Sequence, residues 1–299
     1  MAKVLITGAS GRLGSQLVRR LDELVPESND VYLLQNKNSI LTDQINKKNS
    51  YIVASLPDIR EYDYAFHFAG NIHTSRGNPT KNPENYPEFV RCNIELTRKV
   101  CASSKYVVFA STDNVFSGMD GRDYLESDKP NPPNNYYGRT KAEAEKVVLD
   151  NSGAVVRFQS PIGVPSNLIV DRIFDALEGK PSWPFWNDQY CRPTFFDNIL
   201  HVFKKLHEGE RKGIYHISCS GEAPSRAGIA NKVLEVYRNY DIQREKDYIE
   251  EQPCNDPEFP RRLVLNTEKT RQELEIGEFT SVDEAIRLHV LRIKKPEAI

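Results

Sequence analysis

The segment Lys3-Val4-Leu5-Ile6-Thr7-Gly8-Ala9-Ser10-Gly11-Arg12-Leu13-Gly14 joins an apolar run to a glycine-rich turn. The run Lys3–Thr7 has the continuous apolar character of a strand buried in a parallel sheet. After the turn, leucines recur at helical spacing, at Leu13, Leu17, Leu21 and Leu24. The segment therefore predicts a strand, a tight turn and a helix, which together form the first unit of an α/β fold.

Three glycines give this turn the pattern G-x-x-G-x-x-G. In dinucleotide-binding folds the first glycine permits the tight turn, the second lets the backbone approach the pyrophosphate, and the third allows close helix packing. The helix N-terminus offers unpaired N–H groups to the phosphates. We therefore expect a cofactor to be bound by Gly8, Ser10, Gly11, Arg12, Leu13 and Gly14. A plain glycine-rich turn is the alternative, because glycine triplets alone are weak evidence.

Strand-like runs alternate with helical segments through the first half of the chain. The expected strands cover residues 31–34, 51–54, 64–69, 106–110 and 154–158, and the expected helices cover 88–101 and 140–149. This alternation predicts βαβ units and a parallel sheet covered on both faces. The link between residues 54 and 64 contains Pro57 and is too short for a full helical crossover, so we expect an irregular connection there.

After about residue 160 prolines punctuate the chain, at Pro161, Pro165, Pro181, Pro184 and Pro193. Helical patterns cover residues 197–207, 225–237 and 281–294, and a strand is expected at 214–217. We expect a Rossmann-type doubly wound parallel sheet in residues 1–160 and a smaller C-terminal α/β substrate lobe in residues 161–299. Some segments of the second half are expected to return to the first domain.

The composition excludes several classes of protein. The 299 residues hold 40 basic and 42 acidic side chains, which gives no sign of a nucleic-acid or polybasic membrane binder. No apolar run approaches the length of about 18 residues that a transmembrane helix needs, and no signal peptide is expected. The five cysteines and six histidines lack metal-ligand spacing. We therefore expect no metal site, and reduced thiols in the cytoplasm.

Tyr137 and Lys141 have the spacing Y-x-x-x-K, which places both side chains on one face of a helix. Reduction of a carbonyl by hydride requires a proton for the developing alkoxide, and a tyrosine can supply it if a nearby ammonium lowers its pKa. Roughly one such spacing is expected by chance in a chain with 14 tyrosines. The stronger evidence for a catalytic pair is therefore its position at the start of the helix after the fifth strand.

Ser111 and Thr112 leave the fifth strand at its C-terminal end, where ligands lie in open α/β sheets. A hydroxyl there can hydrogen-bond a substrate carbonyl. The alternative is that both residues merely end the strand.

The end of the second strand bears on the choice of cofactor. NAD enzymes usually carry an acidic residue there that binds the ribose 2′-hydroxyl. Here the run Leu33-Leu34-Gln35-Asn36-Lys37 has no carboxylate, and Lys37 and Arg12 can meet a 2′-phosphate. We expect NADPH, with NADH still open. The alternative is that Lys37 is a solvated loop lysine.

Together these motifs resemble the extended short-chain dehydrogenase/reductase superfamily. They are Thr-Gly-x-x-Gly-x-x-Gly, the strand end His67-Phe68-Ala69, Ser111-Thr112-Asp113-x-Val115-Phe116 and Tyr137-x-x-x-Lys141. Within that superfamily the chain most resembles the dTDP-4-dehydrorhamnose reductase group. Two runs carry this closer resemblance, S-T-D-x-V-F and Asn187–Thr194, which is similar to N-D-Q-x-x-x-P-T. The resemblance spans nearly the whole chain.

The resemblance implies a role for each matching residue. Tyr137 would be the general acid, Lys141 would bind the nicotinamide ribose and lower the pKa of the tyrosine, and Thr112 would hydrogen-bond the reacting oxygen. The further expected cofactor contacts are Asn36, Lys37, Ala69, Gly70, Asn93 and Tyr137, and the implied substrate contacts are Thr112, Asp113, Gln189 and Arg261. The chain departs from the group at Gln35 and Asn36, at the short third crossover, and at Arg192, where the group usually has a small residue.

The implied activity is NAD(P)H-dependent reduction of a nucleotide-linked 4-keto-6-deoxy sugar, as in dTDP-rhamnose biosynthesis. One alternative is an NAD-dependent 4-epimerase. Another is a non-catalytic subunit like the regulatory subunit of methionine adenosyltransferase, which would bind cofactor without turnover. A 4,6-dehydratase is not expected, because that subgroup places an Asp-Glu pair after the active-site threonine and this chain has Asp113-Asn114. We expect a nucleotide-sugar substrate and no nucleic-acid or membrane partner. A homodimer is considered, but the sequence does not decide the oligomeric state.

Overall fold

The computed structural model describes residues 1–34, 50–53, 55–57, 59–72, 82–133, 135–151, 153–164, 168–182, 184–256 and 259–299. The chain divides into two compact units. The first comprises Met1–Phe116, Ser127–Arg157 and Leu200–Tyr215, and the second comprises Ser117–Glu126, Phe158–Ile199 and His216–Ile299. The division into domains at residue 160 stays a prediction.

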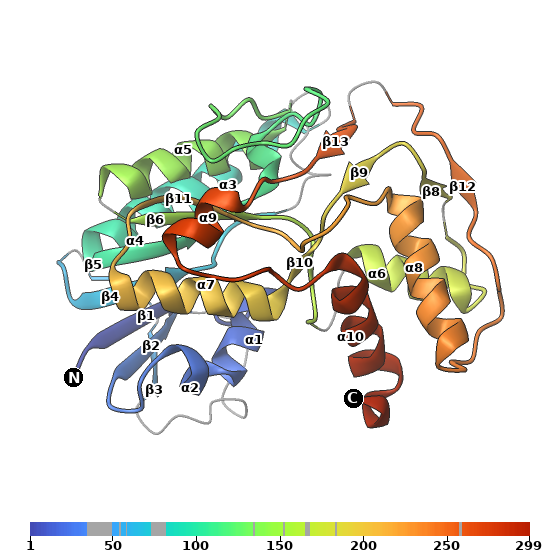
Figure 1. Cartoon of the computed structure of the whole chain (residues 1–299). Coiled ribbons are helices and arrows are strands. Elements are labelled where there is room, and N and C mark those ends of the chain that lie inside the picture. The colour runs from blue at the N-terminus through green and yellow to red at the C-terminus, as the bar shows by residue number, and fades with distance from the viewer. Residues whose placement is uncertain are drawn as a thin grey trace. The chain divides into compact units, whose positions relative to one another are not determined.

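The first unit is built on a seven-stranded sheet with the strand order β11-β6-β5-β4-β1-β2-β3 (Figure 1). The strands are β1 (Lys3–Thr7), β2 (Asp30–Leu34), β3 (Ser50–Val53), β4 (Tyr62–His67), β5 (Ser104–Ala110), β6 (Ala154–Phe158) and β11 (Gly213–Ile217). The neighbouring pairs from β3 to β6 run parallel. The strand order reverses between β1 and β4, which marks the carboxyl ends of these strands as the ligand edge of a doubly wound sheet. The predicted Rossmann-type fold is confirmed.

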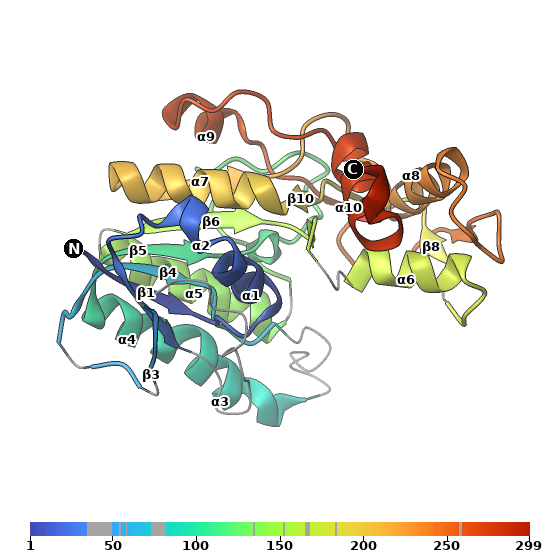
Figure 2. The same ribbon diagram turned by 90° about the horizontal axis from the view of Figure 1, so that it is seen from below.

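Each face of this sheet buries its apolar side chains under helices. Leu5, Val107 and Val155 on one face form a core with Val100 of α4 (Leu96–Ser103) and Ala144 of α5 (Tyr136–Asp150). On the other face, the ring of Phe66 lies 6.1 Å from that of Phe203 on α7 (Phe196–Gly209). Figure 2 shows α4 and α7 on opposite sides of the sheet.

Several helical segments differ in detail from the sequence pattern. The leucine repeat forms two helices, α1 (Arg12–Arg19) and α2 (Leu21–Leu24), because Arg20 leaves the helical backbone. The helix expected at 88–101 is a continuous series of η3 (Pro83–Asn85), α3 (Tyr86–Phe89), the π-helical η4 (Val90–Glu95) and α4. Between β3 and β4, residues 55–57 and 59–61 contain no helix, which confirms the predicted irregular connection.

The strand and the helix predicted at 214–217 and 197–207 contribute to the first unit. β11 lies beside β6 at the end of the sheet, and residues 200–215 belong to the first unit. These are segments of the second half that return to the sheet. β11 pairs with the outer edge of β6, and the helix that carries Phe203 covers Phe66.

The second unit is mainly helical. Helices α6 (Leu168–Leu177), α8 (Arg226–Asn239) and α10 (Val282–Lys294) share one apolar core that includes Phe174, Val233 and Ile286. Its strands form two-residue parallel pairs, β7 (Pro161–Ile162) with β10 (Thr194–Phe195), β8 (Phe185–Trp186) with β12 (Glu251–Gln252), and β9 (Tyr190–Cys191) with β13 (Arg262–Leu263). Prolines at 161, 184 and 193 lack the N–H that a longer ladder needs. Helix α9 (Glu268–Glu273) and the short η6 (Pro296–Ala298) complete this unit.

Three observations concern the chemical environment of the chain. Among the described residues, no helix is both long and apolar enough to cross a membrane. The five cysteines are free thiols. Over the same described ranges, no three His, Cys, Asp or Glu side chains gather as a metal ion would require.

Candidate active site

The glycine turn between β1 and α1 has the geometry of a phosphate-binding loop. Gly8 adopts φ +69°, in the left-handed region, and a Cβ on Gly14 would lie 2.1 Å from the carbonyl oxygen of Gly8. Gly11 is the N-cap of α1, where no side-chain cap is found among the described residues and the first turn carries no acidic side chain. The turn therefore fits the diphosphate of a dinucleotide.

The other predicted cofactor residues lie partly on this turn and partly beside it. Ser10 and Leu13 are partly exposed, and Arg12 is exposed at the start of α1. Ala69 and Gly70 follow β4, and the amide of Ala69 donates to Thr7 Oγ1 at 3.2 Å. Asn36 and Lys37 lie outside the described residues. Contact of these seven residues with a cofactor stays a prediction.

A buried hydrogen-bond chain ties the end of β1 to the end of β4 and to α4. Thr97 Oγ1 donates to the carbonyl of Asn93 at 2.6 Å, so it accepts from His67 Nε2 at 2.9 Å. His67 Nδ1 then accepts from Thr7 Oγ1 at 2.6 Å. Burial lowers the pKa of His67 to about 3, which keeps the imidazole neutral and its tautomer fixed. The sequence showed His67 only as part of a motif and gave no sign of these partners.

Asn93 extends this chain towards α5. Its Oδ1 accepts from the amide of Asn71 at 2.7 Å, and its Nδ2 donates to the carbonyl of Asn71 at 3.1 Å and to Thr140 Oγ1 at 2.9 Å. Asn93 lies in the π-helical η4, and π-helical turns are frequent at functional sites. Its side chain joins the loop after β4 to the helix that carries Tyr137, and cofactor contact by Asn93 stays a prediction.

Helix α5 starts against the short helix η5 (Asp113–Val115) that follows β5. The side chain of Asn135 caps α5 by accepting from the amide of Gly138 at 2.7 Å. A Cβ on Gly138 would lie 2.3 Å from the carbonyl oxygen of Asn114, so only glycine permits this close approach. The packing places the first turn of α5, with Tyr137, beside the residues that leave β5.

The three residues predicted to be catalytic meet at this point. Tyr137 and Thr112 are hydrogen-bonded. Lys141 Nζ donates to the carbonyl of Ala110 at 2.6 Å and lies 3.7 Å from the centroid of the Phe109 ring. The structure thus brings Thr112, Tyr137 and Lys141 together at the carboxyl end of β5, where ligands bind in folds of this kind.

The pKa values of this cluster are set mainly by burial. Burial raises the pKa of Tyr137 to about 12, and the hydrogen bond with Thr112 and the charge of Arg12 only partly oppose the shift. Burial also lowers the pKa of Lys141 to about 7, against the charge of Glu145. The pKa of Tyr137 thus lies above its ordinary value in this structure, and its lowering by the ammonium of Lys141 stays a prediction. The influence of Arg12 on Tyr137 also indicates that the glycine turn lies near this cluster.

Two further polar groups surround Thr112. The carboxylate of Asp113 is buried and accepts at 3.0 Å from both Thr112 Oγ1 and Asn114 Nδ2. The hydroxyl of Ser111 donates to Glu145, which forms a buried ion pair with Arg157. The sequence gave no signal for Glu145 and Arg157, since neither belongs to a motif and only the fold brings them together.

The predicted substrate residues Gln189 and Arg261 lie in the second unit. Gln189 Nε2 donates to the carbonyl of Pro260 at 2.8 Å. Arg261 Nη1 donates to Asp188 Oδ2 at 2.8 Å and to the carbonyl of Cys254 at 2.9 Å. Gln189 and Arg261 thus lie close to each other, while their approach to a substrate held by Thr112 and Asp113 stays a prediction.

Arg192 is held within the second unit as well. Its Nη2 donates to the carbonyl of Leu265 at 2.8 Å and lies 3.3 Å from the carboxylate of Asp123. Arg262 donates to the same carboxylate through Nε and Nη2. The departure from the group at Arg192 is thus accommodated by an acidic partner at Asp123.

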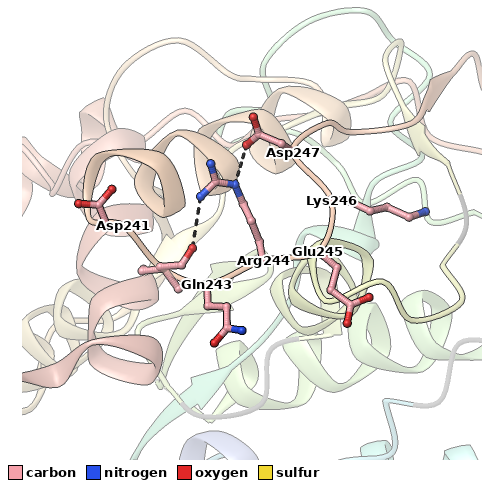
Figure 3. A pocket seen from close by; sticks show the side chains of 7 residues that line it. Asp241, Gln243, Arg244, Glu245, Lys246 and Asp247 are labelled. Carbon is pink, nitrogen blue, oxygen red and sulfur yellow. Dashed lines mark hydrogen bonds and ion pairs between the residues drawn. The ribbon is translucent and has the colours of Figure 1, made fainter.

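A depression in the second unit carries none of the predicted site residues. It is lined by one loop, Asp241–Asp247. Figure 3 shows Arg244 directed towards Asp247, and Arg244 Nε donates to Asp247 Oδ1 at 2.6 Å. The charges of Arg244 and Asp247 are therefore paired with each other. The candidate active site remains at the end of β5.

Known proteins resemble this chain at both the sequence and the fold level. It is 29% identical to the spore coat polysaccharide biosynthesis protein SpsK of Bacillus subtilis over 228 residues, which cover 74% of this chain and 75% of that protein. It is 27% identical to methionine adenosyltransferase 2 subunit beta of Bos taurus over 234 residues, which cover 72% and 66%.

The fold matches the structure of dTDP-4-dehydrorhamnose reductase from Bacillus anthracis in complex with NADP. The TM-score is 0.75 and the identity 22%, over 98% of this chain and 100% of that chain. Solved dTDP-glucose 4,6-dehydratase and UDP-glucuronic acid 4-epimerase structures share the fold, so the fold alone does not choose the reaction. The profile of the family described as RmlD substrate binding domain matches residues 2–288. The chain therefore belongs to the RmlD substrate binding domain family, in agreement with its resemblance to sugar-nucleotide reductases of the extended short-chain dehydrogenase/reductase type.

Proposed function

We propose that this chain is an NADPH-dependent reductase of a nucleotide-linked 4-keto-6-deoxy sugar. The observation that carries the proposal is the meeting of Thr112, Tyr137 and Lys141 at the carboxyl end of β5. A hydroxyl, a phenol and an amine at this position match the needs of carbonyl reduction, namely orientation, a proton and a positive charge. Membership of the RmlD family supports a sugar nucleotide as the substrate.

The residues around the glycine turn fit a dinucleotide. The turn and the uncapped start of α1 would hold the diphosphate, and Lys141 would hold the nicotinamide ribose. When bound, the reduced nicotinamide supplies the hydride for the carbonyl carbon. The choice of NADPH follows from the missing carboxylate in the run Gln35–Lys37.

The side chains of the protein supply the rest of the chemistry. Thr112 would turn its hydroxyl proton from Asp113 to the carbonyl oxygen of the substrate and so orient that oxygen. Tyr137 donates its phenolic proton to the same oxygen as negative charge develops there. Burial raises the pKa of Tyr137 to about 12, so the phenol is protonated at neutral pH, while a pKa nearer the working pH would make it a stronger acid. Gln189 and Arg261 are the residues proposed to bind the sugar nucleotide.

The test is oxidation of NADPH and NADH with a panel of enzymatically made dTDP-, UDP- and GDP-4-keto-6-deoxy sugars. The proposal expects one of these compounds to be reduced, with NADPH used at least as well as NADH. Interconversion of 4-epimers with catalytic NAD, in place of net reduction, would make the protein an epimerase. Cofactor binding without turnover of any compound in the panel would contradict the proposal.

A second candidate function is a regulatory subunit. The observation that favours it is the 27% identity with methionine adenosyltransferase 2 subunit beta. This candidate predicts cofactor binding without reduction, so the same panel separates the two. The association of Thr112, Tyr137 and Lys141 favours the reductase.

The arrangement of Asn114 argues against a 4,6-dehydratase. Dehydration requires a base for the C5 proton and an acid for the 6-hydroxyl, and the amide of Asn114 takes no proton at neutral pH. Asn114 Nδ2 instead donates to Asp113 and Thr112. We expect no 4-keto product, followed by its ultraviolet absorbance, from dTDP-glucose, UDP-glucose or GDP-mannose with catalytic NAD. A clear absorbance signal would place the protein in a different subgroup.

A further inference from the structure

Two side chains of α5, one turn apart, contact consecutive residues at the end of β5. Lys141 Nζ donates to the carbonyl of Ala110 at 2.6 Å. Glu145 Oε1 accepts from the hydroxyl of Ser111 at 2.5 Å. Since Thr112 is the next residue, these two contacts also fix the backbone position from which its side chain extends.

Glu145 is itself held from β6. Arg157 donates to it through two parallel hydrogen bonds, from Nε at 2.9 Å and from Nη2 at 2.7 Å. The exposed fractions are 0% for the Arg157 side chain and 2% for the Glu145 side chain, so solvent and salt hardly screen either charge. The guanidinium of Arg157 also lies 4.9 Å from the centroid of the Phe116 ring. The carboxylate of Glu145 is thus held in a fixed place on the helix that carries Lys141, where Arg157 pairs with its charge and solvent hardly reaches it.

Lys141 lies where an ammonium is costly. Its burial disfavours the charged form, whereas the Phe109 ring, whose centroid lies 3.7 Å from Nζ, favours it through a cation–π contact. The titratable groups around the end of β5 are His67 of β4, Asp113 of η5, Arg157 of β6, and Tyr137 and Glu145 of α5. His67 is neutral at ordinary pH, whereas the charge of Glu145 raises the pKa of Lys141 against the effect of burial.

We propose that Glu145, Arg157 and Ser111 are positioning residues that keep Lys141 in its ammonium form and in contact with the end of β5. Glu145 supplies the charge, and Arg157 and Ser111 hold its carboxylate in place. The proposal rests on the role proposed above for Lys141 and adds residues outside the known motif to that site.

Loss of the negative charge of Glu145 is expected to change the pKa of Lys141 in one direction. The amine of Lys141 would lose its proton more readily in Glu145→Gln, so its pKa would fall further below about 7. The loss of a nearby opposite charge typically shifts a pKa by about one unit or more. At pH 7 most of the Lys141 side chains would then be neutral.

The test follows the ¹³Cε signals of lysine against pH in the whole, ¹³C-lysine-labelled protein, with the Lys141 signal assigned by its loss in Lys141→Arg. Glu145→Gln is expected to lower the apparent pKa of Lys141 by about one unit or more. The matched control is Glu143→Gln, an exposed position two residues away on the same helix, which is expected to leave the titration of Lys141 unchanged.

A second variant covers the case in which Glu145→Gln does not fold. The double variant Glu145→Leu/Arg157→Met replaces the ion pair by apolar side chains of similar volume, a change that buried pairs often tolerate. It is expected to lower the pKa of Lys141 in the same direction. An unchanged Lys141 titration in either folded variant overturns the proposal.

A pH profile separates positioning from a merely structural role. In Glu145→Gln, the basic limb of kcat is expected to move to lower pH, whereas a structural role alone would lower Tm and leave this limb in place. The titration requires no substrate, so it holds even if the protein is not a sugar reductase. Conversely, an active reductase with an unchanged Lys141 titration would refute only the role of Glu145.

Discussion

The end of β5 and the region around Arg261 both hold ion pairs, but the two pairs lie in different environments. Glu145 and Arg157 are almost completely buried and joined by two side-chain hydrogen bonds. Asp188 and Arg261 are 39% and 35% exposed, and Arg261 also donates a hydrogen bond to the backbone carbonyl of Cys254. The first pair joins a strand to a helix, whereas the second joins irregular segments between short strands.

The contrast separates two tasks of the proposed enzyme. Groups for the chemical step lie at the ends of regular elements, where the parallel sheet fixes their positions. Groups proposed for substrate contact lie on connecting segments, which tolerate change more readily than the elements that they connect. We therefore expect changes in the first region to affect stability and turnover, and changes in the second to affect mainly substrate binding.

The largest expected effect is on stability. Arg157→Met leaves the carboxylate of Glu145 buried without its ion-pair partner, which typically costs about 3–5 kcal/mol. The measurement is the free energy of unfolding in urea. Arg261→Met is the matched control and is expected to cost less than about 1 kcal/mol, because its pair is exposed. Equal losses of unfolding free energy in the two variants would show that the two regions do not differ in this way.

The next effect is on turnover. Tyr137→Phe is expected to lower kcat at least about 100-fold while cofactor affinity changes little, because the phenol acts on the oxygen only in the transition state. The measurement is steady-state kinetics on the substrate found in the panel, with cofactor affinity measured separately by fluorescence titration. Near-normal turnover would reject Tyr137 as the acid.

The third effect is on cofactor choice. The wild-type KM for NADPH is expected to be no higher than that for NADH. Arg12→Ala is expected to raise the KM for NADPH about tenfold and to change that for NADH much less, since one charge-assisted hydrogen bond contributes about 1.5–3 kcal/mol. A wild-type enzyme that strongly prefers NADH would overturn this prediction and the proposed use of Arg12.

The smallest effect is expected in the second unit. Asp188→Asn removes the charge that holds Arg261 and is expected to change the free energy of unfolding by less than about 1 kcal/mol. The KM for the nucleotide sugar is expected to rise several-fold with kcat nearly unchanged, because uniform binding is lost. A fall in kcat with an unchanged KM would move Asp188 and Arg261 out of the proposed binding role.

Local patterns in the sequence predicted much of the fold. The glycine turn, the alternation of strands and helices, and the spacing of Tyr137 and Lys141 each depend on residues that are near one another in the chain. These signals were sufficient for the parallel sheet and for the proposed catalytic cluster at the end of β5.

What the sequence did not reveal depends on distant partners. The hydrogen bond between Thr7 and His67 joins residues 60 positions apart, and that between Ser111 and Glu145 joins residues 34 apart. The upward shift in the pKa of Tyr137 depends on burial, which a motif does not report. Likewise, nothing in the leucine repeat indicated that Arg20 interrupts the first helix.

The return of β11 to the sheet has a consequence for synthesis of the chain. All five residues of β6 are buried, and β11 adds the strand beyond it only after about fifty further residues have been made. Until then a nascent chain leaves one edge of β6 unpaired, a template for pairing with other chains. A fragment that stops at residue 160 would keep this edge open permanently. We therefore expect such a fragment to aggregate, even though it contains the glycine turn and the whole of the proposed catalytic cluster.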